Sequence, residues 1–169
     1  MYNTFSAESF REIVSLYSGY VYTIVFRLLG NKTDAEEATQ ETFVKAFKNL
    51  DHFDESKGWK NWLCTIALNT ARDFYRKSRR ERILIDRSAP VEAFMDERAG
   101  ESNPDEKLDV QKMLASLDLK YRTVIVLFYM EQHSVKEIAE LLKKPESIIK
   151  IWLFRARKTI LKLHGDTAE

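Results

Sequence analysis

Residues 134–163 read SVKEIAELLKKPESIIKIWLFRARKTILKL, and this stretch decides the fold of the C-terminal part of the chain. Ser134 followed by Glu137 has the form of a helix capping box, which predicts a helix from Val135 to Leu142. After a short break, Pro145 suits the first turn of a longer predicted helix over residues 146–163. A short helix, a tight turn and a longer helix make a helix-turn-helix, whose second helix enters the major groove of DNA.

Positive charge is concentrated in this longer helix. Residues 143–162 carry seven basic side chains and one acidic one, although the net charge of the whole chain is only +1. Residues 54–82 form a second basic block, and residues 86–107 between the two are acidic. Two basic blocks indicate two surfaces that face a polyanion. The alternative, Lys and Arg that merely solvate helix faces, explains residues 54–82 better than residues 143–162.

The N-terminal half begins with two predicted helices. Apolar residues recur at helical spacing over residues 10–28, which predicts a helix that ends near Gly30. Thr33 and Glu36 form a second capping-box pattern. A helix is therefore predicted to begin just after Thr33 and to run over residues 34–50.

A third helix is predicted after a polar break at residues 52–60. It starts near Trp59–Trp62, carries Leu63, Ile66 and Ala67 on its apolar face, and ends in the basic residues 76–80. Three helices of this length can enclose a modest core.

The periodic pattern is lost over residues 86–105, where Pro, Gly, Ser and Asn sit among acidic residues. This composition is typical of a flexible linker. Two short helices, over residues 104–116 and 121–129, are predicted beyond it. The predicted fold class is all-α, with two small helical domains, residues 1–85 and 106–169, joined by the acidic linker.

Other features of the sequence exclude several classes of protein. The single cysteine, Cys64, excludes an internal disulfide and fits a reducing compartment, and the three scattered histidines do not have metal-ligand spacing. No secretory signal is visible, and no apolar run approaches the roughly 20 residues of a membrane span. Phosphate-binding Gly loops and nucleophile motifs of enzymes are absent. We expect a soluble cytoplasmic protein that is not an enzyme and uses no metal or cofactor.

Several segments of the chain resemble one known family. Residues 34–43 (DAEEATQETF) and 62–69 (WLCTIALN), with Asp73 and Arg76, are similar to the σ2 domain of ECF-type bacterial RNA polymerase sigma factors. Residues 121–127 (YRTVIVL), 137–139 (EIA) and 154–157 (FRAR) are similar to the σ4 domain of that family. The segments occur in the family's order and cover nearly the whole chain.

This resemblance implies a promoter-specificity subunit without catalytic activity, which binds core polymerase and promoter DNA. The alternative is a conventional helix-turn-helix regulator, which binds duplex DNA without polymerase and uses residues 1–85 for an effector or for dimerisation. The family is typically held inactive by an anti-sigma factor, often membrane-bound, although this chain is not itself expected to enter the membrane.

The resemblance also implies where polymerase binds. The predicted second helix is expected to dock on the clamp helices of the β′ subunit, and the polymerase β flap is a further expected contact. An acidic face that ends in exposed aromatic side chains suits a basic, partly apolar partner. The candidate residues are Asp34, Glu37, Gln40, Glu41, Phe43 and Phe47.

By the same resemblance, residues 51–80 melt and capture the −10 promoter element. Opened bases need aromatic or polar pockets and charge that neutralises the backbone. Trp62 and Phe74 are expected to be structural, and Asp73 is expected to pair with Arg76 or Lys77. The candidates for contact with DNA are Trp59, Lys60, Asn69, Arg76, Arg79 and Arg80.

The positions that read the −35 element align with the long C-terminal helix. They are Lys150, Ile151, Trp152, Phe154 and Arg155, followed by Arg157 and Lys158. The chain departs from the family here, because Ile151 and Trp152 replace two expected polar contacts. Ile151 has two possible uses, apolar contact with thymine methyl groups and packing against polymerase or an inhibitor.

Overall fold

The computed structural model describes residues 7–85 and 104–164, and all regular structure in these ranges is helical. The predicted all-α class is therefore confirmed. The chain divides into two compact units, residues 1–93 and 94–169, which are described separately. Most of the predicted linker, residues 86–103, lies outside the described residues.

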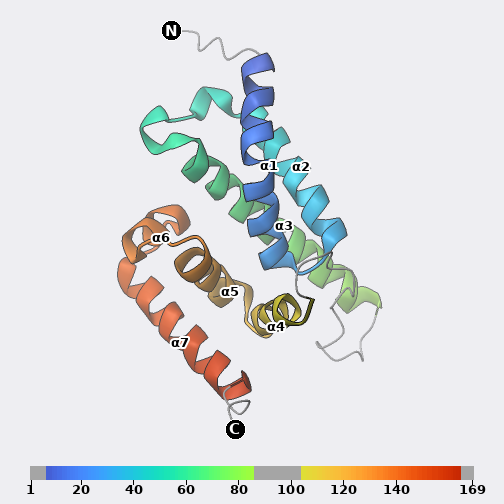
Figure 1. Cartoon of the computed structure of the whole chain (residues 1–169), viewed down its shortest axis with the longest axis vertical. Helices are drawn as coiled ribbons and strands as arrows, with labels where there is room; N and C mark the ends of the chain where they lie inside the picture. The colour runs from blue at the N-terminus through green and yellow to red at the C-terminus, as the bar shows by residue number, and fades with distance from the viewer. Residues whose placement is uncertain (1–6, 86–103, 165–169) are drawn as a thin grey trace. The chain divides into compact units, whose positions relative to one another are not determined.

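Unit 1 is a bundle of three helices. They are α1 (Ala7–Leu29), α2 (Lys32–Lys48) and α3 (Gly58–Ile85), and each packs against the other two (Figure 1). Two single-turn 3₁₀ helices, η1 (Leu50–His52) and η2 (Glu55–Lys57), connect α2 to α3. The bundle therefore presents a long face of α2 and a long face of α3 to solvent.

Small side chains on α2 allow the three helices of unit 1 to pack closely. Ala35, Ala38 and Ala46 are fully buried against the branched residues of α1 and the apolar face of α3. Thr42 is buried as well, and its hydroxyl donates to the carbonyl of Ala38 at 2.7 Å, so that its burial leaves no unpaired hydroxyl. The other fully or almost fully buried apolar residues are Val21, Ile24, Val25, Leu28, Leu63, Cys64, Ala67 and Ala71.

The turn between α1 and α2 corrects one prediction. α1 ends at Leu29, and Gly30 follows it with a φ of 81°, in the left-handed region that glycine tolerates, as expected. The N-cap of α2 is Asn31 instead of Thr33: its side-chain oxygen accepts a hydrogen bond from the backbone N–H of Asp34 at 2.7 Å. The predicted capping box at Thr33 and Glu36 is therefore wrong, because the chain enters the helix two residues earlier.

Aromatic side chains fix the connection between α2 and α3. The ring of Phe53 stacks on Trp59 with centroids 3.9 Å apart and meets Trp62 edge-on at 5.1 Å. Phe10 of α1 contacts both Phe47 at 5.2 Å and Trp59 at 6.4 Å. This aromatic cluster ties residues 49–57 to the end of the bundle.

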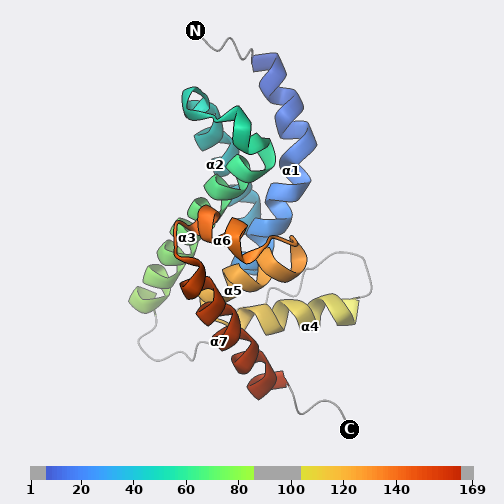
Figure 2. The same ribbon diagram turned by 90° about the vertical axis from the view of Figure 1, so that its left-hand side faces the viewer.

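Unit 2 contains α4 (Pro104–Ala115), α5 (Leu119–Ile125), the π-helical turn η3 (Val126–Met130), α6 (Val135–Leu142) and α7 (Glu146–His164). α5 lies beside α7, and α6 also packs on α7 (Figure 2). The predicted helix over residues 121–129 is present as α5 followed by η3. The core of unit 2 is formed by Leu114, Leu117, Val124, Ile125, Val126, Leu127, Ile138, Ile149, Leu153 and Ala156.

A buried arginine joins α4 to α5. Arg122 is only 5% exposed, and its guanidinium donates to the carbonyls of Leu114 at 2.7 Å, Leu117 at 3.1 Å and Ala115 at 3.2 Å. Carbonyls at the end of a helix have no partner within the helix. Arg122 satisfies those at the end of α4 and neutralises the negative end of its dipole.

Candidate nucleic-acid interface

The helix-turn-helix predicted from sequence is present as α6, the turn 143–145 and α7. Ser134 and Glu137 form the reciprocal capping box: the hydroxyl of Ser134 accepts from the N–H of Glu137 at 3.2 Å, and the carboxylate of Glu137 accepts from the N–H of Ser134 at 2.7 Å. The hydrogen bond from the Ser134 N–H, together with a second one that the Ser134 hydroxyl donates to the same carboxylate at 2.8 Å, lowers the pKa of Glu137. α6 ends at Leu142, and its C-cap residue Lys143 adopts the left-handed conformation with φ 52° and reverses the chain into α7.

The two faces of α7 have different character. Ile149, Leu153 and Ala156 are buried against the rest of unit 2. Ile151 and Phe154 lie on the opposite side and are 43% and 64% exposed. Of the predicted −35 residues, Lys150, Ile151, Phe154, Arg155, Arg157 and Lys158 are exposed, whereas Trp152 is only half-exposed.

Tyr121 contacts one of these residues and was not predicted as part of the site. The guanidinium of Arg155, as a hydrogen-bond donor to the Tyr121 hydroxyl, is the main cause that lowers the pKa of this tyrosine. Arg155 of α7 therefore lies beside Tyr121 of α5. Nothing in the local sequence around Tyr121 signals this pairing, because it depends on how α5 packs on α7.

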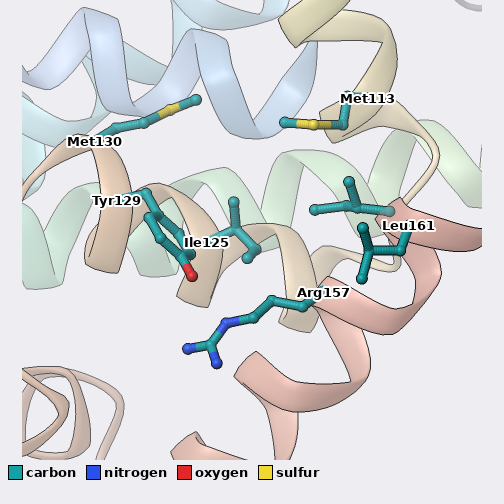
Figure 3. Close-up of a pocket in the computed structure, with 7 residues that line it drawn as sticks. Met113, Ile125, Tyr129, Met130, Arg157 and Leu161 are labelled. Atoms are coloured by element: carbon teal, nitrogen blue, oxygen red, sulfur yellow. The ribbon is translucent and has the colours of Figure 1, made fainter. Parts of the chain in front are cut away.

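Arg157 lies apart from the outward face of α7. Its guanidinium carbon is 5.9 Å from the ring centroid of Phe128 and 5.8 Å from that of Tyr129. It lines an apolar cavity of about 370 Å³, together with residues from α4, α5, η3 and α7: Met113, Ile125, Tyr129, Met130, Ile160 and Leu161 (Figure 3). Arg157 is thus placed against aromatic rings of its own unit, away from Ile151 and Phe154.

The exposed face of α3 carries most of the predicted −10 candidates. Asn69, Arg76, Arg79 and Arg80 are all exposed along this helix. The side-chain oxygen of Asn69 accepts a hydrogen bond from Arg72 at 2.7 Å, which adds another guanidinium to this face. α3 therefore offers a row of cations that suits a nucleic-acid backbone.

The other two −10 candidates lie at the start of α3 and already have intramolecular contacts. Trp59 is half-buried in the aromatic cluster with Phe53 and Trp62. The ammonium of Lys60 lies 4.8 Å from the ring centroid of Tyr20 on α1. Both residues therefore already contact other side chains of unit 1.

Asp73 pairs with α2, which corrects the expected pairing within α3. Its carboxylate lies 3.6 Å from the ammonium of Lys45. The same ammonium is 3.6 Å from Glu41 and 3.4 Å from the hydroxyl of Thr70. Pairing with Arg76 or Lys77 was predicted from sequence proximity, but the packing of α2 on α3 brings Lys45 to Asp73.

The acidic face of α2 differs from the prediction in its aromatic residues. Glu37, Gln40 and Glu41 are exposed as expected. Phe43 is only 8% exposed and belongs to the core, so that it cannot be presented to a partner, whereas Phe47 is 50% exposed. Asp34 is half-buried and its carboxylate accepts from the side-chain amide of Asn31 at 2.7 Å.

Val44 is an apolar residue of this face that the sequence reasoning missed. It is 46% exposed and follows Gln40 by one helical turn, on the same side as Glu37 and Glu41. The sequence signal that could have identified it is an apolar residue at helical spacing from the polar and acidic residues of the same face. The surface of α2 defined by Glu37, Gln40, Glu41, Val44 and Phe47 is called the α2 face below.

Within residues 7–85 and 104–164, no group of His, Cys, Asp and Glu side chains is arranged to hold a metal ion. No helix in the same ranges is long and apolar enough to cross a membrane. Cys64 is fully buried in the core of unit 1, where a thiol is usually inert.

Comparison with known proteins relates both units to one family. Residues 13–81 match the family model of sigma-70 region 2, and residues 107–160 match the family model of sigma-70 region 4. The ECF RNA polymerase sigma factor SigW of Bacillus subtilis (strain 168) is 32% identical over 169 residues, which cover 94% of this chain and 90% of SigW.

Solved structures show the same fold. CnrH, in complex with the cytosolic domain of CnrY, is 25% identical and has a TM-score of 0.72, with 98% of this chain and 93% of CnrH covered. The sigma factor RpoE of Bartonella quintana, in complex with the anti-sigma factor NepR, is 23% identical with a TM-score of 0.71 and coverages of 95% and 99%. With both sigma-70 regions matched and a close relative in SigW, the chain belongs to the ECF family of bacterial RNA polymerase sigma factors.

Proposed function

We propose that this sigma factor divides promoter recognition among three surfaces: the α2 face binds core polymerase, the exposed face of α3 opens and holds the −10 element, and the N-terminal half of α7 reads the −35 element. The observation that carries the proposal is the outward face of α7. It follows a capped helix and a tight turn, and it is basic where a helix-turn-helix meets DNA.

The α2 face supports docking on the β′ clamp helices. It combines three exposed polar or acidic side chains with two large apolar ones, Val44 and Phe47. Protein interfaces commonly place an apolar centre inside a polar rim. A basic partner surface with an apolar groove would complement both components. The β flap is proposed as a second polymerase contact.

The exposed face of α3 is suited to binding the separated strands of opened DNA. The strand separation of a promoter costs free energy, because bases lose their stacking and pairing. A row of exposed Arg and Lys side chains offsets part of this cost by binding the backbone of the separated strands, and aromatic rings at the start of α3 offer surfaces for unstacked bases.

We further propose that an anti-sigma factor controls this chain. The sigma factor RpoE, which has the same fold, was crystallised with the anti-sigma factor NepR. A protein that covers the α2 face would prevent polymerase binding without any chemical change to the sigma factor. The chain itself would act in the cytoplasm, with any attachment to the membrane supplied by this partner.

The experiment that tests the proposal is run-off transcription with bacterial core polymerase, with and without the full chain. Promoter-dependent transcripts that require the chain support the proposal. A chain that binds duplex promoter DNA with full affinity alone, and neither binds core polymerase nor directs initiation, is a conventional regulator and contradicts it.

A further inference from the structure

The outward face of α7 carries two large apolar side chains where a DNA-reading helix usually carries polar ones. Ile151 and Phe154 are 43% and 64% exposed, and they lie three positions apart. The buried side of the same helix is formed by Ile149, Leu153 and Ala156, so that the outward pair contributes nothing to the core of unit 2. Residues three apart on a helix lie on the same face and form one continuous apolar patch.

The surroundings of this patch identify the charge of its partner. Lys150, Arg155 and Lys158 are exposed around Ile151 and Phe154, and Arg155 lies beside the hydroxyl of Tyr121. The only acidic residue in 143–162 is Glu146 at the start of the helix. A patch with cations on its border fits a polyanion that has an apolar group between its negative charges.

The major groove of DNA offers one such group. The C5-methyl of thymine is an apolar group on the base edges there, next to the O4 acceptor of the same base, whereas guanine, cytosine and adenine present hydrogen-bond donors and acceptors alone. Ile151 and Phe154 have no side-chain donor or acceptor. Opposite a G·C pair they would remove water from polar groups without replacing its hydrogen bonds, which is unfavourable. The patch therefore favours thymine and disfavours G·C.

The spacing of the two side chains matches neighbouring base pairs. Three residues advance an α-helix by about 4.5 Å along its axis, against a rise of about 3.4 Å per base pair in B-DNA. Both residues lie in the N-terminal half of α7 (Glu146–His164), which is the part of a recognition helix that contacts base edges.

We propose that Ile151 and Phe154 read two neighbouring A·T pairs of the −35 element through their thymine methyl groups, while Lys150, Arg155 and Lys158 bind the flanking phosphates. This inference rests on the proposed placement of α7 at the −35 element. It assigns Ile151, one of the two residues at which this chain departs from its family, to specificity for thymine, together with Phe154 of the family-like segment 154–157.

The test uses holoenzyme made from bacterial core polymerase and the full chain. Bound promoters are first selected from a DNA library with a randomised −35 element, and two adjacent A·T pairs are expected among the preferred positions. Each thymine there is then replaced by deoxyuridine, which removes only the methyl group. Each replacement is expected to weaken holoenzyme binding about fourfold, the effect of one buried methyl-sized group.

Variants of the chain assign each methyl to one side chain. Ile151→Ala should remove the thymine–deoxyuridine difference at one position and Phe154→Ala at the other, whereas Ile151→Val should retain most of it. Leu163→Ala, which truncates an apolar side chain that is 55% exposed on the same helix, serves as the matched control and should retain both differences.

Equal binding of thymine and deoxyuridine promoters by the parent holoenzyme would overturn the inference and leave the sigma function intact. Variants at Ile151 and Phe154 that weaken binding equally on thymine and deoxyuridine promoters would also overturn the inference, because the two side chains would then contact a protein surface and not the methyl groups. Selection of G·C pairs opposite both side chains overturns it too. A holoenzyme that selects no promoter at all overturns the proposed function and this inference together.

Discussion

The guanidinium of Arg122 donates a hydrogen bond to the carbonyl of Leu114 at 2.7 Å, across the junction between α4 and α5. Arg122 is 5% exposed and also donates to the carbonyls of Ala115 and Leu117. One side chain therefore closes the end of α4 and joins it to the helix on which Tyr121 is placed. Tyr121 on that helix lies beside Arg155 of α7.

Replacement of Arg122 by Met is expected to destabilise unit 2 by about 2–4 kcal/mol, because buried carbonyls lose hydrogen bonds from a charged donor. Hydrogen exchange of the amides of α4 and α5, measured on the full chain, reports this loss locally. Lys112→Met on the exposed side of α4 is the matched control and should exchange as the parent does. Unchanged protection in the Arg122 variant would show that the hydrogen bonds contribute nothing to stability.

Asn31→Ala is expected to weaken the start of α2 by about 1 kcal/mol, since the N-cap oxygen that binds the N–H of Asp34 is lost. Thr33→Ala, two residues later, should cost at most a few tenths of a kcal/mol. The amide signals of α2 followed through a urea titration measure both variants. A larger loss of stability in Thr33→Ala than in Asn31→Ala would show that Thr33 is the N-cap in solution and would contradict the structure.

Phe47→Ala and Val44→Ala should each lower the affinity of the chain for core polymerase by about tenfold if the α2 face is the docking surface. Val44→Ala should leave stability nearly unchanged, whereas Phe47→Ala also loses its ring contact with Phe10 and should destabilise unit 1 modestly. Phe43→Ala should instead unfold or destabilise unit 1, because this ring is buried. Binding isotherms with core polymerase, paired with thermal unfolding curves, separate the two effects. The matched control is Leu16→Ala, an apolar residue on α1 that is 71% exposed. Polymerase affinity that survives both α2 variants argues for a different docking surface.

Lys150→Ala and Lys158→Ala are each expected to flatten the salt dependence of holoenzyme binding to promoter DNA. The slope of log affinity against log salt should fall in magnitude by about 0.9 for each phosphate that the variant no longer neutralises. Ile151→Ala should weaken binding without any change in this slope, because it carries no charge. Titrations at several salt concentrations distinguish these roles. An unchanged slope in both lysine variants would show that neither Lys150 nor Lys158 binds a phosphate.

Local hydrogen bonds were the most predictable part of this molecule. The capping box of α6 depends on Ser134 and Glu137 alone, which lie one helical turn apart, so that sequence spacing determines it. The start of α2 was less predictable, because Asn31 and Thr33 are both good cap residues. The chain reversal at Gly30 decides in favour of Asn31.

Features that depend on packing between helices were not predictable in the same way. Phe43 and Phe47 lie one turn apart on α2, yet α1 and α3 bury only the first. Asp73 has basic neighbours in sequence and pairs instead with Lys45 of another helix. The hydrogen bond between Arg155 and Tyr121 likewise needs α5 and α7 to be placed together.

The division of work between α3 and α7 is tested most directly by comparing fully duplex promoters with promoters whose −10 region is already unpaired. At subsaturating holoenzyme, an Arg79→Ala/Arg80→Ala variant should initiate poorly on duplex DNA and recover part of its activity on the pre-opened template, which removes the cost of strand separation although the contacts with the separated strands stay lost. A Lys150→Ala/Arg155→Ala variant should remain equally impaired on both templates, because its defect lies in reading −35 DNA. Recovery of the α7 variant to the parent level, or an α3 variant equally impaired on both templates, would contradict the account.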